Sequence, residues 1–329
     1  MTKGLNQKLK MLYLKDIFER ETDDEHSLTL QQITERLKDK GVNADRKTLY
    51  SDFQELRNYG MDIISSNNGR GCAYHLGARQ FELPELKMLV DSVQAAQFIC
   101  DSKSHDLIEK LGELTSQGQE ASLKRQVVIA GRVKTKNMSV YLTVDKLHQA
   151  INDNVQVRFH YTKWNINKRL VRRNGGDWFQ VSPWLMILSD ENYYLAAYYE
   201  KTGEIRHYRV DKIKDLQLLP DQKRLGQEAY AKLDIPKYAN THFGMFNGQE
   251  TRVEIKTPNE KVGIFLDRFG RGIMPIPADA DHVTLTFPVA VSDQFLGWVM
   301  ALGPDVEILA PQWVRDKMKQ AGERLVHQY

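Results

Sequence analysis

The sequence predicts a multidomain α+β protein, and three observations support this class. Apolar residues recur at helical spacing in the N-terminal region. The middle region contains several short segments in which apolar and polar residues alternate, as in strands. Near the end, segments typical of strands alternate with segments typical of helices. We expect four consecutive parts. They are a helical unit with a β-hairpin at 1–78, a helical linker at 79–142, a small β-barrel at 143–220 and an α+β sandwich at 221–329.

Composition excludes several classes of protein. With 329 residues, 41% hydrophobic and 27% charged, the chain has the balance of a globular protein of two or three domains rather than a disordered one. It has no run of eighteen apolar residues and no apolar segment near its start, so we expect no membrane partner and no secretion signal. Cys72 and Cys100 cannot form a disulfide framework or a four-cysteine metal site, which fits a reducing cytoplasm.

Positive charge is concentrated in one block. The net charge is only +3, yet residues 124–173 contain twelve Lys or Arg against two Asp. A local basic field on a nearly neutral protein is typical of anion binding. A basic surface that only meets solvent is the alternative.

Three helices are predicted before residue 61. The first has the apolar stripe Leu9, Leu12, Ile17 and Phe18. The second opens at the capping box Thr29–Gln32, buries Ile33 and Leu37, and ends at Gly41. The third follows Asp45 as N-cap, buries Leu49, Phe53 and Leu56, and ends at Gly60.

The third helix exposes hydrogen-bond donors that suit the major groove of DNA. These residues are Arg46, Lys47, Thr48, Tyr50, Ser51 and Gln54. Segments 61–64 and 73–76 then form a predicted two-stranded wing, with Asn68 and Arg70 at its tip. A three-helix scaffold used for protein contacts is the alternative.

A helical linker follows the wing. Leu83-Pro84 opens a helix with an apolar face that includes Leu86, Leu89 and Val90, and a second helix is expected at 105–114. These faces fit either a homodimer or an intramolecular helical bundle.

The middle region is predicted to form a small barrel with an anion site. The expected strands are 155–161, 178–181, 184–188, 193–199 and 205–210. Tyr194 and Tyr208 each offer a ring with a hydroxyl, and Arg206 and Arg209 offer planar donors for phosphate. Alternation places Arg206 and Tyr208 on one face of their strand and His207 and Arg209 on the other. We therefore favour Arg206 with Tyr194 for the ligand, and Arg209 with Asp211 as a structural pair. In the alternative, Tyr193, Leu195 and Tyr208 are core residues.

The chain resembles two kinds of bacterial regulator sequence. Its string Asp45–Phe53 is similar to the recognition helix of winged helix-turn-helix regulators, with Ser51 where that family usually has Arg. Tyr193-Tyr194-Leu195, the string Arg206–Ile213 and Val181-Ser182-Pro183 resemble the WYL-domain family, which implies an SH3/Sm-like barrel that senses a ligand. Ser182 therefore joins the expected ligand residues. Phe295–Val299 and Leu302-Gly303-Pro304 resemble the WCX-type C-terminal extension of that family.

The expected function is regulation of transcription. We find no motif for catalysis, and the nine histidines lack metal-ligand spacing, so neither enzyme activity nor a cofactor is predicted. The resemblance implies a homodimeric, nucleoid-associated repressor that binds double-stranded operator DNA and a negatively charged effector, a nucleotide or a single-stranded nucleic acid, in stress response or phage defence. The alternative is an accessory protein whose barrel binds single strands without regulating a promoter.

Overall fold

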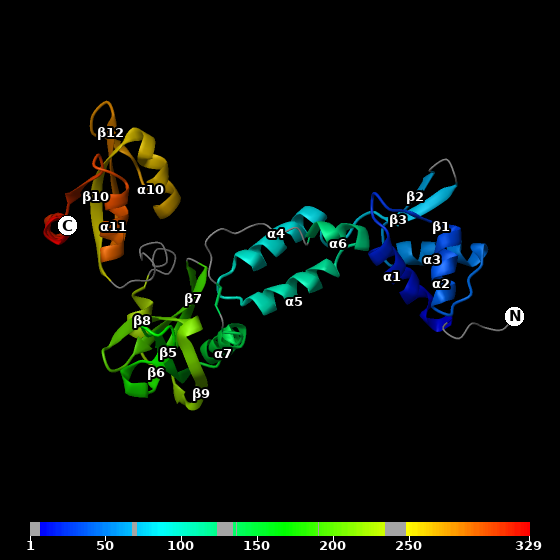
Figure 1. Cartoon of the computed structure of the whole chain (residues 1–329), viewed down its shortest axis with the longest axis horizontal. Coiled ribbons are helices and arrows are strands. Elements are labelled where there is room, and N and C mark those ends of the chain that lie inside the picture. The colour runs from blue at the N-terminus through cyan, green and yellow to red at the C-terminus, as the bar shows by residue number, and fades with distance from the viewer. Residues whose placement is uncertain (1–6, 68–70, 124–133, 136, 190, 234–247) are drawn as a thin grey trace. The chain divides into compact units, whose positions relative to one another are not determined.

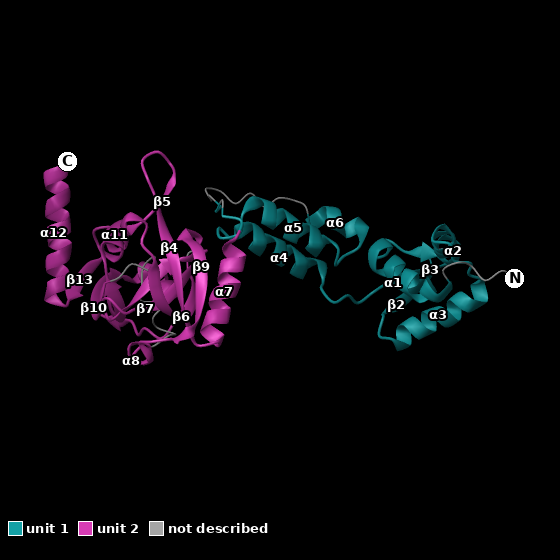
Figure 2. Cartoon of the chain, turned by 90° about the horizontal axis from the view of Figure 1, so that it is seen from below, with its two compact units in different colours: residues 1–138 teal, residues 139–329 magenta. Residues whose placement is uncertain are grey.

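The structure, a computed structural model, describes residues 7–67, 71–123, 134–135, 137–189, 191–233 and 248–329. The chain divides into two compact units, residues 1–138 and 139–329 (Figures 1 and 2). The first contains helices and a small sheet, and the second contains two larger sheets with helices. The predicted multidomain α+β class is confirmed.

The first unit contains six α-helices and three strands among its described residues. In chain order they are α1 (Lys10–Glu21), β1 (Leu28–Thr29), α2 (Leu30–Asp39), α3 (Arg46–Asn58), β2 (Ile63–Asn67), β3 (Cys72–Leu76), α4 (Leu83–Ala95), α5 (Asp101–Gly112) and α6 (Gln117–Leu123). The strands form an antiparallel sheet in the order β1-β3-β2. Strand β1 and helix α6 were not predicted.

Local capping starts the helices as predicted. The Thr29 hydroxyl accepts a hydrogen bond from the Gln32 amide, and the Gln32 side chain accepts one from the Thr29 amide. Asp45 accepts a hydrogen bond from the amide of Thr48 and caps α3. Gly41 follows α2 with φ +74°, the left-handed conformation that favours glycine.

One apolar core joins α1, α2, α3 and the small sheet. Ile17, Phe18, Ile33, Leu37, Leu49, Phe53 and Leu56 are buried in it, as predicted. The prediction for the start of α1 was wrong, because Leu9 and Leu12 are exposed and Leu14 takes the core position. Leu14 lies three residues before Ile17 and four before Phe18, so it continues the same helical face.

The helices α4, α5 and α6 pack on a second, smaller core. Pro84 occupies the first turn of α4, where the missing N–H has no intrahelical partner to lose. Leu86, Val90 and Leu123 are buried together, whereas Leu89 is exposed, contrary to the predicted apolar face.

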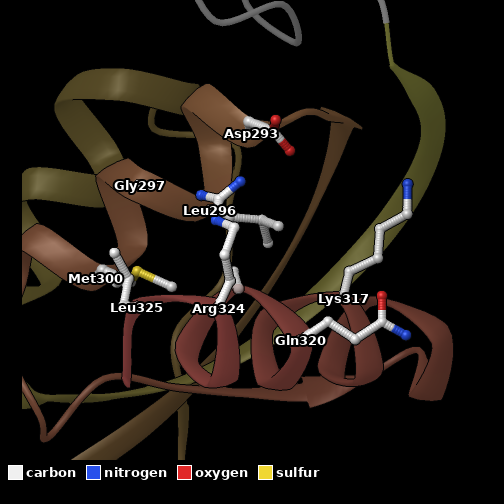
Figure 3. A pocket seen from close by; sticks show the side chains of 9 residues that line it. Asp293, Leu296, Gly297, Met300, Lys317, Gln320, Arg324 and Leu325 are labelled. Carbon is white, nitrogen blue, oxygen red and sulfur yellow. The ribbon is translucent and has the colours of Figure 1, made fainter. Parts of the chain in front are cut away.

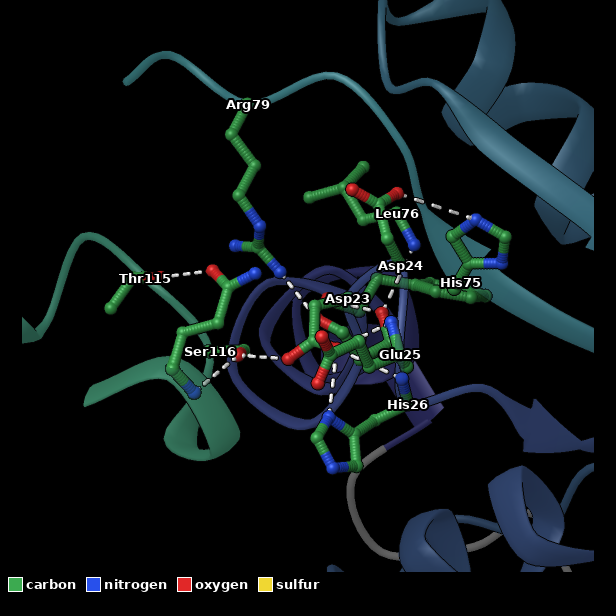
Figure 4. Close-up of polar contacts among 12 residues, drawn as sticks. Asp23, Asp24, Glu25, His26, His75, Leu76, Arg79, Thr115 and Ser116 are labelled. Carbon is green, nitrogen blue, oxygen red and sulfur yellow. Dashed lines mark hydrogen bonds and ion pairs between the residues drawn. The ribbon is translucent and has the colours of Figure 1, made fainter. Parts of the chain in front are cut away.

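A buried polar network attaches the end of α1 to the corner between α5 and α6 (Figure 4). Asp23 is 2% exposed and accepts hydrogen bonds from the Ser116 hydroxyl and from the amides of Glu25 and His26. Its other contact is His26 Nδ1, at 2.7 Å. Burial acts to raise the pKa of Asp23, but the hydrogen bonds from Ser116 and His26 outweigh it and the pKa is lowered.

Arginine side chains reinforce the same junction. Arg20 donates to the Gly112 carbonyl at 2.8 Å and to Glu120 Oε2 at 2.8 Å. Arg79 donates to the carbonyls of Glu19 and Thr22 at the end of α1. The carbonyl groups at the end of a helix have no hydrogen-bond donor within the helix, and these two guanidinium groups supply donors to several of them.

The second unit begins with α7 (Val140–Asn152) and a curled six-stranded antiparallel sheet. Its strands are β4 (Val155–Trp164), β5 (Leu170–Arg172), β6 (Phe179–Ser189), β7 (Asn192–Tyr199), β8 (Glu204–Arg209) and β9 (Ile213–Lys223). The order is β5-β4-β6-β7-β8. Strand β9 pairs with β4 outside this order, along the edge of β4 opposite to β6. The sheet curls into half of a barrel over a core that includes Val157, Phe159, Leu195 and Val210.

Two strand predictions in this sheet were wrong. Segments 178–181 and 184–188 belong to one continuous strand, β6, in which the register shifts between Pro183 and Leu185. A bulge of this kind lets proline, which has no N–H to donate, remain within the strand. Strand β9, eleven residues long, was not predicted.

The segment after β9 folds back over β6. Arg224 stacks on the Trp184 ring at 4.1 Å from its centroid and donates to the Pro183 carbonyl. The Trp184 ring also stacks on Tyr230, in the short helix α8 (Gln227–Ala231), with ring centroids 4.6 Å apart. Trp184 Nε1 donates to the Leu225 carbonyl.

The C-terminal part of the second unit is a four-stranded antiparallel sheet with three helices. Its elements are β10 (Gln249–Pro258), α10 (Val262–Phe269), β11 (Ile276–Pro277), β12 (His282–Val291), α11 (Asp293–Ala301), β13 (Glu307–Ala310) and α12 (Gln312–Gln328). The order β11-β12-β10-β13 gives the βαββαβ arrangement of a ferredoxin-like fold, with α12 added. Buried side chains from both layers, such as Phe265, Phe287 and Phe295, form its core.

We predict that Asp23→Ala lowers the free energy of unfolding of the first unit by about 2–3 kcal/mol, because three donors lose a buried acceptor. Urea unfolding followed by α-helical circular dichroism measures this change. Asp24→Ala, whose carboxylate is exposed, is the matched control and should stay within about 0.5 kcal/mol. Since the folded pKa of Asp23 is lowered, its contribution is present above the unfolded value of about 3.9 and is lost as pH falls through the folded pKa. An equal loss in both variants would contradict the network's role.

Candidate nucleic-acid interface and effector site

Helix α3 presents all six of the predicted DNA-contacting side chains to solvent. Each of these residues is exposed: Arg46, Lys47, Thr48, Tyr50, Ser51 and Gln54. Positions 47, 50, 51 and 54 recur at three- and four-residue spacing and therefore share one face of the helix. Asn68 and Arg70, predicted at the wing tip, lie outside the described residues.

Local contacts order part of this face. Arg46 donates to the Tyr50 hydroxyl from Nε at 3.3 Å and from a terminal nitrogen at 3.2 Å, and its guanidinium lies 5.9 Å from the ring centroid. The hydrogen bond from Arg46 lowers the pKa of Tyr50. The Thr48 hydroxyl donates to the Asp45 carbonyl and accepts from Lys10. It is therefore already hydrogen-bonded within the protein, at the start of α3.

The opposite face of α3 is fixed to α1 and the sheet. Phe53 packs against Phe18 and Tyr74, with ring centroids 5.2 and 5.0 Å apart. Lys10, which is 7% exposed, forms an ion pair with Asp52. Apolar packing and this ion pair together hold the helix so that its donor face points outward.

The register of β7 and β8 separates the residues that the sequence paired in one ligand site. Tyr194 lies opposite Arg209, whereas Arg206 lies opposite Ala197 and Tyr208 lies opposite Leu195. Directly opposed residues share a face of the sheet, and neighbours along a strand alternate. The expected combination of Arg206 with Tyr194 was therefore wrong: the two side chains are on opposite faces.

Arg206 and Tyr208 share the face that also carries an aromatic cluster. The Arg206 guanidinium lies 4.8 Å from the centroid of the Tyr199 ring. Among the described residues, the Tyr208 hydroxyl is buried and has no hydrogen-bond partner. Burial raises the pKa of Tyr208, and nearby Arg206 opposes this shift. A tyrosine hydroxyl of ordinary pKa is already protonated at neutral pH, so this one can donate a hydrogen bond.

The aromatic rings that pack around Tyr208 belong to residues that were not predicted as part of the ligand site. Phe159, Tyr161 and Phe179 lie with their ring centroids 5.3, 5.4 and 6.0 Å from that of Tyr208. Phe159 and Tyr161 are alternate residues of β4, so the two-residue period of that strand was the signal that could have identified them.

Arg209 forms the structural pair that was expected. It makes two hydrogen bonds to the Asp211 carboxylate, at 3.1 and 3.0 Å, and one to Asn192 Oδ1 at 2.9 Å. Its backbone amide donates to the Tyr161 hydroxyl at 3.0 Å. These contacts occupy its guanidinium, so Arg209 has less to offer an anion than Arg206 does.

The other two expected ligand residues are also engaged in packing. Ser182 is 2% exposed, and its hydroxyl accepts a hydrogen bond from the Leu225 amide at 2.9 Å. Tyr194 is buried with Ile187 and Ala196 in a small cluster on the second face of the sheet. The expected five-residue site is thus divided between the two faces of the sheet.

A cavity that was not predicted lies between α11 and α12 (Figure 3). Its volume is about 370 Å³, and the side chains of Lys317 and Arg324 rise from α12 along its edge. Leu296 and Met300 of α11 give it an apolar side. No cluster of three or more His, Cys, Asp or Glu suited to a metal ion occurs in the part of the chain that the structure describes. Within that part, no helix is both long and apolar enough to cross a membrane.

Comparison with known proteins matches the second unit to two domain families. The WYL domain model matches residues 143–218, and the WCX domain model matches residues 250–326. The chain is 20% identical over 287 residues to a Bacillus subtilis (strain 168) protein named uncharacterized HTH-type transcriptional regulator YobV, covering 83% of this chain and 86% of that protein. Among solved structures it matches proteasome accessory factor B/C (PafBC) of Arthrobacter aurescens at 17% identity and a TM-score of 0.28. That match covers 99% of this chain and 49% of the PafBC chain, so this chain spans about half of its length.

Removing the hydroxyl group from either of two tyrosines in the aromatic cluster should affect stability differently. Tyr161→Phe should lower the free energy of unfolding by about 1–2 kcal/mol, because the Arg209 amide loses its acceptor. Tyr208→Phe should be neutral within about 0.5 kcal/mol, because its hydroxyl has no partner to lose. Urea unfolding of the full chain, with hydrogen exchange of the β8 amides to assign the transition, measures both. A larger loss for Tyr208→Phe would show that this hydroxyl is already bonded.

Proposed function

This chain carries a WYL domain followed by a WCX domain, and on that basis we propose that it is a DNA-binding transcriptional regulator, a repressor, controlled by a negatively charged effector. The observation that carries the proposal is the donor face of α3. An exposed helix with Arg46 and Lys47 in its first turn has the chemistry that major-groove recognition requires. The relative named as an HTH-type transcriptional regulator supports the same assignment.

We assign the parts of the chain accordingly. Residues 1–78 are a winged helix-turn-helix domain, with α2 and α3 as its helix pair and β2 and β3 as its wing. Residues 79–142 are a helical linker and dimerisation region, 143–220 are an SH3/Sm-like sensor barrel and 221–329 are the C-terminal extension. A homodimer in the cytoplasm, associated with the nucleoid, would bind two half-sites of a pseudo-palindromic operator.

The effector site is assigned to the aromatic face of the curled sheet. Arg206 offers a planar cation beside the Tyr199 ring, and Tyr208 offers a buried donor without a partner. A guanidinium beside a tyrosine ring and a phenol hydroxyl suit an effector that carries an anionic group, such as a nucleotide or the end of a nucleic-acid strand. Tyr194 has no part in this assignment.

Regulation then follows from linkage between the two sites. An effector changes operator affinity only by the difference between its own affinities for the two arrangements of the protein. The proposal requires no catalytic step, so the chain's residues bind and orient but do not transform the effector.

Combining Arg46→Ala with Lys47→Ala should lower operator affinity by about 100-fold or more, since each lost base or phosphate contact is worth about 1–3 kcal/mol. Footprinting of the DNA upstream of the chain's own coding region identifies the operator. Fluorescence anisotropy with that duplex then measures the affinity. Lys319→Ala removes another exposed cation, from α12, and is the control. Unchanged affinity in the double variant, with the fold intact by circular dichroism, would rule out α3 as the recognition helix.

Arg206→Ala should leave operator affinity unchanged and remove its response to effector, tested with adenosine monophosphate and with a short oligothymidine. Tyr208→Phe should weaken the same response without a loss of stability, because it removes only the unpartnered donor. If neither probe alters the operator affinity of the unsubstituted protein but the oligothymidine still binds, that result favours the second candidate function, a single-strand-binding accessory protein that uses Arg206 beside the Tyr199 ring.

A further inference from the structure

The hairpin between β4 and β5 extends from the curled sheet and is strongly basic. It pairs Lys163 with Val171 and Trp164 with Leu170, and its loop stands out from the sheet in Figure 2. Residues 163–173 contain five Lys or Arg and no Asp or Glu. This hairpin lies within the basic block of the sequence, and the proposed effector site makes no use of it.

Hydrogen bonds define the tip of the hairpin. The Asn165 amide donates to the Arg169 carbonyl, and the Arg169 amide donates to Asn165 Oδ1, each at 2.9 Å. Lys168 has φ +58°, a left-handed conformation that is unfavourable for a lysine. This closed turn leaves Ile166 98% exposed. The tip thus exposes an isoleucine to water close to a lysine with a strained backbone. Neither feature stabilises the fold, so folding alone does not explain this sequence.

The cations divide into a fixed base and a free tip. At the base, Arg172 pairs with Asp215 at 3.0 Å, and the Arg173 guanidinium lies 5.8 Å from the Tyr161 ring centroid. Within the described residues, the side chains of Lys168 and Arg169 have no carboxylate within ion-pair distance, although both are exposed. The base therefore holds the hairpin in place, while the charges at the tip remain available for a partner.

We propose that this hairpin is a DNA arm, in which Ile166 enters the minor groove and wedges between base pairs while Lys168 and Arg169 contact the flanking phosphates. Proteins that bend DNA from the minor groove use an apolar wedge flanked by Lys, Arg and Asn, and Asn167 adds the amide beside this wedge. The inference rests on the proposed DNA-binding function and adds a second contact, one that bends the operator.

Duplex DNA fits this tip better than a single strand does. Single strands are held by stacking of bases on aromatic rings, and isoleucine offers no ring. Trp164, two residues before Ile166 in the hairpin, has Lys212 Nζ 5.1 Å from its ring centroid, so one of its faces lies beneath a cation. The apolar wedge and the free cations instead match the two needs of a bent duplex, which are separation of a base step and neutralisation of phosphates.

The test uses the full-length protein and the footprinted duplex labelled at both ends, so that energy transfer reports bending and anisotropy reports affinity. Ile166→Ser should reduce the bend and lower affinity about tenfold. Lys168→Gln with Arg169→Gln should reduce the slope of log affinity against log salt by about 1.8, because two phosphate contacts of about 0.9 each are lost. Met274→Ser, at another highly exposed apolar position, and Lys319→Gln are the matched controls and should change neither quantity.

The outcomes separate the arm from the recognition helix. Unchanged bending, affinity and salt slope in the hairpin variants, while Arg46→Ala with Lys47→Ala still lowers operator affinity by about 100-fold or more, would overturn the arm and leave the proposed function standing. Loss of oligothymidine binding without any change on the duplex would overturn it in favour of a single-strand contact. Because the substituted side chains are exposed, circular dichroism should show the same fold in every variant.

Discussion

The curled sheet of the second unit depends on strand β4, whose two edges are both occupied. One edge pairs with β9, the other pairs with β6, and its far end pairs with β5. Backbone groups on both sides are thereby satisfied, which makes β4 the centre from which the sheet curls. The same strand delivers Phe159 and Tyr161 to the aromatic cluster and continues outward as one arm of the basic hairpin. The core packing, the aromatic cluster and the hairpin thus share one element.

What could be predicted from the sequence was mainly local. Thr29 and Asp45 cap their helices because each side chain reaches an amide only three residues away, and neither contact depends on the rest of the fold. Alternation along β8 also correctly separated Arg206 from Arg209. The partner of Arg206 could not be predicted in this way. It depends on the register between β7 and β8, which the intervening turn sets and which a single strand does not contain.

The missed strand has a related explanation. Strand β9 mixes charged and apolar residues, and apart from Ile213 its side chains are half-buried or exposed, so it shows no continuous apolar face. Its place is fixed by the long-range ladder to β4 rather than by its own composition. In the first unit, likewise, the hydrogen bond of Ser116 to Asp23 joins residues 93 positions apart, and no local pattern could indicate it. The junction it makes is polar and buried, which explains why its residues resemble surface positions in the sequence.

The fold-back after β9 bears on how the WYL domain can be excised. The family match ends at residue 218, yet the Ser182 hydroxyl takes its hydrogen bond from Leu225, and both Arg224 and Tyr230 stack on the Trp184 ring. A fragment cut at 218 would leave a buried hydroxyl without its donor and would remove both groups that stack on this tryptophan. A fragment that runs to residue 233 retains these contacts. The structural boundary of the WYL domain therefore lies some fifteen residues beyond the boundary that sequence similarity marks.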